Sequence, residues 1–180
     1  SKFTGAYVKV PNPGRYDWIY DLDLTSLYPS IIMSLNISIE TKKAKIIDFD
    51  VEDFKKRIDR SWTVQTDKEQ LHLQTEDLIK YLTDTKYSIS SNGVMYKTDR
   101  AGLIPSILDR WFNERVEYKN LRKKFEKEGD KAKVVYFDQM QYTTKILLNS
   151  MYGVMGSPSF RFFDIDNAEG VTTTGQQLIK

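Results

Sequence analysis

The sequence predicts an α+β fold, because strand patterns and helix patterns occupy separate stretches of the chain. Residues 105–152 carry a long helical pattern that is broken once, at Gly129-Asp130, whereas the flanking stretches mix short strand patterns with short helices. Neither an internal repeat nor a low-complexity linker divides the 180 residues. We therefore expect one domain or two small ones.

The first part of the chain predicts two strands and a helix. Residues 6–10 alternate as a short strand does, and residues 16–24 are rich in aromatic and aliphatic side chains. A helix that ends near Leu35 is expected to follow, because Thr25-Ser26 supplies candidate N-cap residues and Pro29 suits a first helical turn.

The middle of the chain has a weaker pattern. Within residues 42–86 we expect helices near residues 50–59 and 75–83. Residues 87–97 predict a β-hairpin, because Asn92-Gly93 at its centre tolerates the positive φ angles of a tight turn.

Two long helices and a short tail complete the predicted order of elements. The helices are expected over residues 105–128 and 131–152, with the Gly-Asp break between them. A strand at residues 159–164 and a helix from about Asp166 are expected to follow. The two long helices would form an antiparallel hairpin.

Composition narrows the possible chemistry. The chain has 27 Lys and Arg against 25 Asp and Glu, no cysteine, and one histidine, His72. Disulfides, a thiolate nucleophile and zinc-finger sulfur ligands are therefore excluded, and a Ser-His-Asp triad has little room. Oxygen ligands for a hard cation such as Mg²⁺ remain. No apolar run approaches a membrane span, no signal peptide opens the chain, and a first residue other than Met suggests a piece of something larger.

The end of the second predicted strand has the features of a metal and phosphate site. Asp23 stands directly before a helix N-terminus, where a carboxylate can bind a divalent cation. The backbone amides of Ser26, Leu27 and Tyr28, together with the helix dipole, suit phosphate oxygens. Spacing alone also fits an acidic strand end followed by an ordinary capped helix, and that alternative stays open.

On the first long helix, basic residues continue a face that begins as apolar. An apolar stripe from Leu108 to Phe112 continues, at helical spacing, to Arg115 and Lys119. Residues 110–133 carry nine basic and five acidic side chains. A solvated mixed-charge face explains this imbalance equally well.

The second long helix adds a third cation. Lys145, Asn149 and Tyr152 share one face at helical spacing. The face expected to lie opposite is apolar and consists of Met140, Leu147, Leu148 and Met151. If the helices are antiparallel, Arg115 and Lys119 converge with Lys145 and repel it, unless an anion such as a triphosphate lies among them. The alternative to such an anion site is that the lysines extend into solvent and do not converge.

Five short segments resemble motifs of family B DNA polymerases and occur in the order in which that family carries them. Residues 23–30 (DLTSLYPS) are similar to motif A, D-x-x-S-L-Y-P-S, and residues 145–153 (KILLNSMYG) to motif B, K-x-x-x-N-S-x-Y-G. Residues 3–6 (FTGA), 36–38 (NIS) and 115–119 (RVEYK) resemble, in turn, the Y-x-G-G/A element before the palm, the N-I-S after motif A and the R-x-x-x-K of the first fingers helix. Details of motif A and of the N-G-x-M-Y hairpin lean toward the T4-like phage branch.

The resemblance implies a role for each matching residue. Asp23 would bind two catalytic Mg²⁺ ions, with the carbonyl of Leu24 on the nucleotide-side ion. Tyr28 would act as a steric gate that excludes a 2′-hydroxyl, and Lys145 would also donate a proton to the leaving pyrophosphate. The remaining roles are to hold the triphosphate (amides of Ser26, Leu27 and Tyr28; side chains of Arg115, Lys119, Lys145 and Asn149) and to contact template DNA (Gly5, Tyr152 and Gly153).

The resemblance also implies what is missing. No Y-G-D-T-D-S type hairpin, the family's motif C with its second metal-binding Asp, occurs in the chain. The resemblance divides the chain into a first part of the palm (1–104), a fingers hairpin (105–144) and motif B with the return to the palm (145–180). Such a palm–fingers fragment of a DNA-directed DNA polymerase would be inactive alone. Its partners would be primer–template DNA, dNTPs and the missing palm and thumb, in the same polypeptide or in a second subunit.

Two other functions stay open. The first alternative is a non-catalytic helical hairpin that binds nucleic acid, but such a module has no use for a carboxylate at Asp23. The second alternative is a palm-type enzyme that makes RNA, but an aromatic ring at Tyr28 selects deoxyribose.

The predicted fingers are short. Only 25 residues separate Lys119 from Lys145, as in the compact fingers of cellular and archaeal members. The expected location is the cytoplasm, of a host cell if the protein is viral, with the nucleus as an alternative and no membrane partner.

Overall fold

The computed structural model describes residues 24–180, with side chains from Ser26 onward. The strand predicted over residues 6–10 and all but the last residue of the strand predicted over residues 16–24 lie outside the described residues, as do Gly5 and Asp23. The elements in chain order are α1 (Leu24–Leu35), β1 (Lys42–Ile46), α2 (Val51–Lys55), β2 (Ser61–Thr66), β3 (Gln70–Gln74), α3 (Thr75–Thr85), β4 (Ser88–Ile89), β5 (Val94–Tyr96), α4 (Leu103–Glu128), α5 (Lys131–Met155) and α6 (Ile165–Ile179). The predicted α+β class is confirmed.

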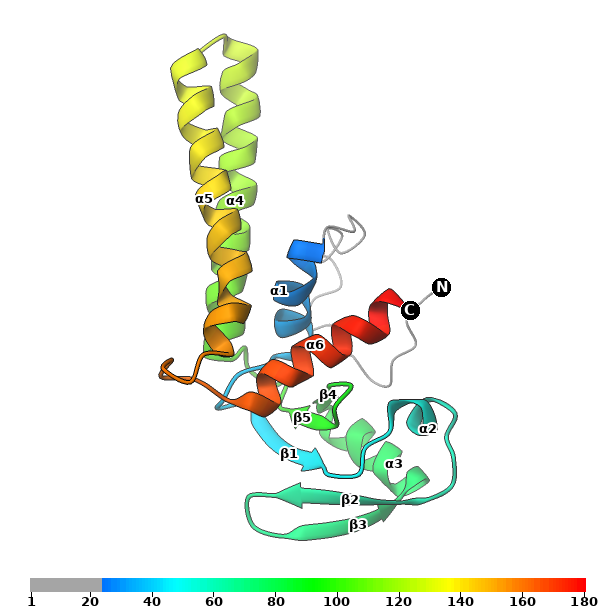
Figure 1. Cartoon of the computed structure of the whole chain (residues 1–180). Helices are drawn as coiled ribbons and strands as arrows, with labels where there is room; N and C mark the ends of the chain where they lie inside the picture. Colours follow the sequence, from blue (N-terminus) through cyan, green and yellow to red (C-terminus); the bar gives the residue numbers. More distant parts are fainter. Residues whose placement is uncertain (1–23) are drawn as a thin grey trace.

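The strands form one sheet in the order β3-β2-β1-β5-β4, in which every neighbouring pair is antiparallel (Figure 1). Alternating burial explains why β2 forms a strand with one covered face. Its residues Trp62 and Val64 are buried, whereas Ser61 and Gln65 are exposed.

Two hydrophobic cores organise the described residues, and β5 contributes to both. The sheet core lies under α2 and α3 and is built around Trp62, which is fully buried and donates its indole N–H to Thr75 Oγ1 at 3.0 Å. The helical core joins residues of α1, α4, α5 and α6. Because side chains alternate along a strand, Val94 and Tyr96 enter the helical core and Met95 enters the sheet core.

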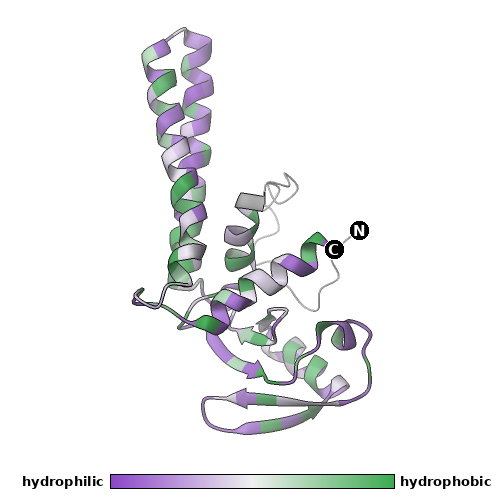
Figure 2. Ribbon diagram, in the orientation of Figure 1, coloured by the Kyte–Doolittle hydropathy of each residue, from purple (hydrophilic) through white to green (hydrophobic). Residues whose placement is uncertain are grey.

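Helices α4 and α5 form the predicted antiparallel hairpin, which extends away from the sheet (Figure 1). Gly129 ends α4 with a φ of 73°, a left-handed conformation that glycine adopts without steric cost. Asp130 then caps α5 by accepting a hydrogen bond from the Lys133 N–H at 3.1 Å. Hydrophilic residues dominate the outer half of the hairpin (Figure 2). None of the described helices combines the length and the apolar character that crossing a membrane requires.

Asn36 joins the helical core to the start of the hairpin. It follows α1 with a φ of 59°, a conformation that asparagine tolerates. Its Nδ2 donates to the carbonyls of Lys97 and Arg100, at 2.7 Å each, and its Oδ1 accepts from the Gly102 N–H at 2.8 Å. Gly102 is the N-cap of α4, so the side chain of Asn36 fixes where this helix begins.

The structure confirms some predicted elements and corrects others. The β-hairpin at residues 87–97 is confirmed as β4 and β5, and the helices near residues 50–59 and 75–83 as the shorter α2 and as α3. Three strands that the sequence did not indicate, β1, β2 and β3, also lie within residues 42–86.

Two further predictions are wrong. Residues 159–164 form turns instead of the predicted strand, and Asp164 caps α6 by accepting from the Asn167 N–H at 3.1 Å. Helix α1 already begins at Leu24, so Pro29 lies inside the helix and not in its first turn.

Candidate functional site

Two tyrosines from distant parts of the sequence meet where α1 packs against α5. The ring centroids of Tyr28 and Tyr152 are 4.7 Å apart, with 46° between the ring planes. Both side chains are half-buried and pack against the helical core. The fold therefore places the segment of residues 26–30 beside the segment of residues 145–153.

The N-terminal turn of α1 is directed the same way as the tip of the hairpin (Figure 1). Because α1 begins at Leu24, the amide of Ser26 lies in the first turn, whose N–H groups have no partner within the helix. The amides of Leu27 and Tyr28 lie where bonding to the carbonyl four residues earlier begins. Of the three amides predicted to hold phosphate, that of Ser26 is therefore the best placed for an anion.

The predicted division of α5 into two faces needs a correction. The buried face consists of Thr144, Leu148, Met151 and Met155, whereas Leu147 is 40% exposed. Lys145, Asn149 and Tyr152 are half-buried and adjoin this face, and Tyr152 packs on the core, so these residues do not lie opposite it. Gly153 is exposed, and a Cβ atom there would meet nothing within 4 Å.

The cations of the hairpin form a series along its length. Arg115 Nε donates to Gln141 Oε1 at 3.3 Å, which places these two residues at the same level. Lys145 lies four residues from Gln141 toward the base, and Lys119 lies four residues from Arg115 toward the tip. At about 1.5 Å per helical residue, Lys145, Arg115 and Lys119 follow one another in steps of about 6 Å.

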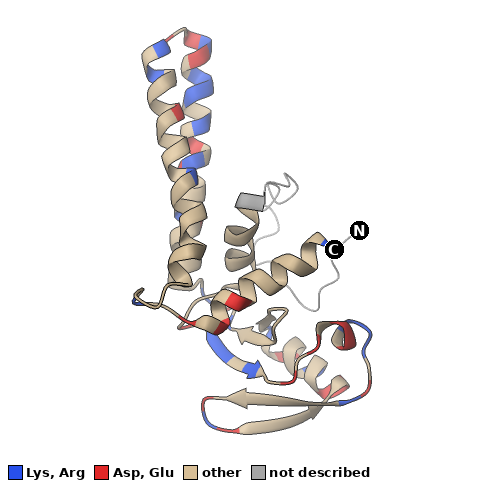
Figure 3. Cartoon of the chain, viewed as in Figure 1, with Lys and Arg blue, Asp and Glu red and all other residues tan. Residues whose placement is uncertain are grey.

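An exposed ion pair joins the two helices of the hairpin farther out. Arg122 Nη1 lies 2.9 Å from Asp138 Oδ1, which also accepts from Gln141 Nε2 at 3.1 Å. The hydrogen bonds from Arg122 and Gln141 lower the pKa of Asp138 below its ordinary value. Basic and acidic residues are frequent in this part of the hairpin (Figure 3).

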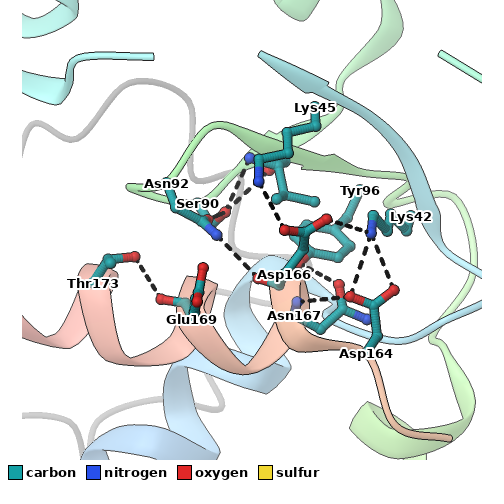
Figure 4. Close-up of polar contacts among 11 residues, drawn as sticks. Lys42, Lys45, Ser90, Asn92, Tyr96, Asp164, Asp166, Asn167, Glu169 and Thr173 are labelled. Atoms are coloured by element: carbon teal, nitrogen blue, oxygen red, sulfur yellow. Dashed lines mark hydrogen bonds and ion pairs between the residues drawn. The ribbon is translucent and has the colours of Figure 1, made fainter. Parts of the chain in front are cut away.

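The described residues contain one prominent group of acids near lysines, at the start of α6 (Figure 4). Lys42 Nζ lies 3.0 Å from both Asp164 Oδ2 and Asp166 Oδ2, and Lys45 Nζ lies 2.7 Å from Asp166 Oδ1. Burial alone would lower the pKa of Lys42, but its hydrogen bonds with the two aspartates outweigh that effect and raise it. The hydrogen bond from Lys45 is the main cause of the lowered pKa of Asp166.

These acids are therefore neutralised by lysines. Within the described part of the chain, no group of three or more His, Cys, Asp or Glu residues is placed to hold a metal ion. The predicted ligand Asp23 lies outside the described residues, and Leu24 opens α1.

The comparisons with known proteins agree with this architecture. The model of DNA polymerase family B matches residues 1–180, and the chain therefore belongs to this family. The DNA-directed DNA polymerase of Escherichia phage RB69 is 28% identical over 226 residues, which cover 99% of this chain and 23% of the phage protein. DNA polymerase 1 of Pyrococcus abyssi is 29% identical over 177 residues, which cover 98% of this chain and 18% of the archaeal protein.

Similarity extends to eukaryotes and to a solved structure. The DNA polymerase delta catalytic subunit of Schizosaccharomyces pombe is 30% identical over 99% of this chain and 14% of its own length. The structure of the family B DNA polymerase from Pyrobaculum calidifontis covers 87% of this chain and 16% of its own, with a TM-score of 0.60 and 20% identity, and supports the fold. The chain thus spans between 14% and 23% of the curated relatives named here.

Proposed function

We propose that the chain is the palm–fingers portion of a DNA-directed DNA polymerase. Residues 1–104 would form the first part of the palm, residues 105–144 the fingers and residues 145–180 the return to the palm. The observation that carries the proposal is the contact of Tyr28 with Tyr152, because it joins motif A to motif B at the base of a hairpin that bears a series of cations. The reaction is template-directed transfer of a nucleotide from a dNTP to a primer 3′-hydroxyl.

The cation series suits a triphosphate. Lys145, Arg115 and Lys119 spread positive charge over about 12 Å of the hairpin, so an extended polyanion can be held at several points. The amides of the first turns of α1, with Ser26 best placed and Leu27 and Tyr28 next to it, add uncharged donors.

The tyrosines and their neighbours would shape the base and sugar sites. Tyr28 lies beneath the sugar and rejects a 2′-hydroxyl, and Asn149 supports the pocket from the same side of α5 as Lys145. Gly5, Tyr152 and Gly153 are proposed contacts of the template strand. The open space at Gly153, where a Cβ atom would meet nothing within 4 Å, lets a nucleic acid backbone approach α5 closely.

Asp23 and the carbonyl of Leu24 are the proposed ligands of two Mg²⁺ ions. Such ions neutralise phosphate charge and activate the attacking hydroxyl. Because Mg²⁺ prefers near-octahedral oxygen coordination, a further carboxylate is needed, and motif C in another part of the polymerase would supply it. We therefore expect this chain alone to show no polymerase activity and at most weak, salt-sensitive binding to DNA.

The complete polymerase that contains this chain tests the proposal. Asp23→Asn is expected to abolish incorporation while leaving primer–template binding largely intact, and near-normal turnover would refute the metal role. Lys145→Ala is expected to lower kcat about 10²- to 10³-fold, as removal of a preorganised charge donor does. If Lys145→Ala weakened only DNA affinity, this lysine would be a backbone contact, as in a non-catalytic nucleic-acid-binding hairpin. Tyr28→Ala is expected to admit ribonucleotides.

A further inference from the structure

A glycine on α6 lies against the ring of Tyr28. Gly175 is buried, and a Cβ atom added there would lie 3.0 Å from Tyr28 Cε1 and 3.6 Å from Ile31 Cδ1. A separation of 3.0 Å is too short for two non-bonded carbon atoms, whose optimal separation is about 3.5–4.0 Å. Any side chain at position 175 would therefore press on the edge of the tyrosine ring.

Space, and not backbone conformation, accounts for glycine at this position. Among the described residues, positive φ angles at glycine occur only at Gly93 and Gly129, so Gly175 has a φ open to any residue. Glycine is also a poor helix former, and it lies in the interior of α6. The chain thus keeps an unfavourable helical residue where the ring of Tyr28 touches the helix.

Helix α6 is fixed and has little freedom to retreat from an added methyl group. At its start Asn167 Oδ1 accepts from the buried hydroxyl of Tyr96 at 2.7 Å, and Lys42 and Lys45 pair with Asp166 (Figure 4). Beside Gly175 itself, Thr174 Oγ1 accepts from the Ser91 N–H at 3.0 Å. An added methyl group would therefore displace the ring rather than the helix.

Tyr28 is held by two helices at once. The ring meets Gly175 on α6 and Tyr152 on α5, 4.7 Å away between centroids. A ring pushed away from α6 has to change its packing with Tyr152 and its place in the sugar site.

We infer that Gly175 is a positioning residue that sets the place of Tyr28 and, through it, the discrimination between deoxyribose and ribose. This inference rests on the proposed gate role of Tyr28. Gly175 is not a proposed contact of substrate or metal, and it acts only through the tyrosine ring.

The test is a double-mutant cycle in the complete polymerase, with kcat and KM measured for one dNTP and its matching rNTP. Gly175→Ala is expected to raise KM more than it lowers kcat and to change the dNTP-to-rNTP ratio of kcat/KM about tenfold. In the Tyr28→Ala background the same substitution is expected to leave that ratio unchanged, because the ring is gone.

Gly170→Ala is the matched control, since it also adds a methyl group to a buried glycine of α6. There the new Cβ would lie 3.2 Å from Ser90 Oγ and Asn92 Oδ1, away from Tyr28. Gly170→Ala is expected to lower the melting temperature without changing the sugar ratio. An equal change of the ratio in both alanine variants would overturn the inference, because the effect would then belong to α6 as a whole.

The remaining outcomes separate this inference from the proposed function. If Tyr28→Ala itself leaves sugar discrimination unchanged, the gate role is wrong and the inference falls with it. If Tyr28→Ala relaxes discrimination but Gly175→Ala has no effect, or the same effect with and without the ring, the gate stands and the inference is wrong. If Gly175→Ala does not fold, the double variant with Tyr28→Ala is expected to fold, and its failure to do so would also overturn the inference.

Discussion

The sheet body (residues 42–96) and the outer hairpin (residues 109–143) are stabilised in different ways. Trp62, Leu78 and Leu82 of the sheet body are fully buried. In the described structure, by contrast, no residue of α4 beyond Leu108 and no residue of α5 before Thr144 is buried. The sheet body thus depends on burial of apolar surface, and the outer hairpin on contacts across one pair of helices.

The contacts of the outer hairpin are aromatic and ionic. Phe125 and Phe137 stack with centroids 5.6 Å apart and ring planes at 4°, and Lys133 Nζ lies 4.6 Å from the centre of the Phe125 ring. Arg122 and Asp138 form an ion pair nearby. The aromatic contacts join the two helices, while the side chains of Arg122 and Asp138 remain well exposed.

The largest effect is expected for Trp62→Ala in the sheet body. Removing a fully buried aromatic side chain leaves a cavity and removes one hydrogen bond to Thr75 Oγ1, and should lower the free energy of unfolding by about 3–5 kcal/mol. Urea unfolding measures this loss. Ile47→Ala, at a side chain that is 56% exposed, is the control and should cost less than about 0.5 kcal/mol. Similar losses in the two variants would contradict the importance of burial.

A smaller effect is expected for Phe125→Ala in the outer hairpin. The ring is half-buried, so the substitution removes one aromatic stack and should cost about 1–1.5 kcal/mol. Hydrogen exchange should accelerate at amides near the hairpin turn and not in the sheet. Val135→Ala, at an exposed side chain on the same hairpin, is the control. A loss as large as that of Trp62→Ala would show that the two regions do not differ.

Asp166→Asn tests an ionic contact of the sheet body and depends on pH. The partly buried pairs with Lys42 and Lys45 should contribute about 1 kcal/mol at neutral pH. Because the pKa of Asp166 is lowered in the folded state, this contribution is complete above its ordinary value of 3.8 and is lost as the pH falls through the lower folded value. Unfolding of the two proteins should therefore converge in acid. Glu169→Gln, at an exposed side chain on the same helix, is the control and should change the free energy of unfolding by less than about 0.5 kcal/mol at neutral pH.

The smallest effect is expected for Asp138→Asn, the ionic counterpart in the outer hairpin. Both partners of its ion pair are well exposed, with 40% of the Arg122 side chain and 50% of the Asp138 side chain accessible. Solvent screens such a pair, so urea unfolding should not distinguish the variant from the parent at physiological salt. A clear loss of stability there would mean that the outer hairpin relies on its ion pair more than this comparison allows.

The sequence predicted the helices better than the strands. The helical hairpin was recognisable because its apolar spacing and its Gly-Asp break are local features. The sequence did not indicate β1, because three of its five residues are lysines and only two positions are buried. Lys42 and Lys45 pair with Asp164 and Asp166 at the start of α6, and only the folded chain brings these acids near. β2 and β3 were missed because the turn between them, at residues 67–69, contains no glycine or proline.

The candidate site was predictable in its parts and not in its assembly. The sequence identified Tyr28 and Tyr152 through the segments that resemble motifs, but their contact depends on how α1 packs against α5. Nothing local marked Gly175, because its role appears only when α6 folds back onto α1. The strand predicted at residues 159–164 was wrong because its aromatic run packs as turns, with Phe160 against the helical core.

Because Asn36 holds the N-terminal end of α4, a tilt of this helix at that end moves its residues by amounts that grow with their distance from Asn36. The helix has 26 residues and is therefore about 39 Å long, and the side chain of Asn36 grips the cap at its lower end. A tilt of about 5° at that end would carry the tip about 3 Å sideways, Lys119 about 2 Å, and the level of Lys145 only about 1 Å. A small change of angle at Asn36 thus moves the cations of the hairpin by different distances, and the cations nearest the tip move farthest.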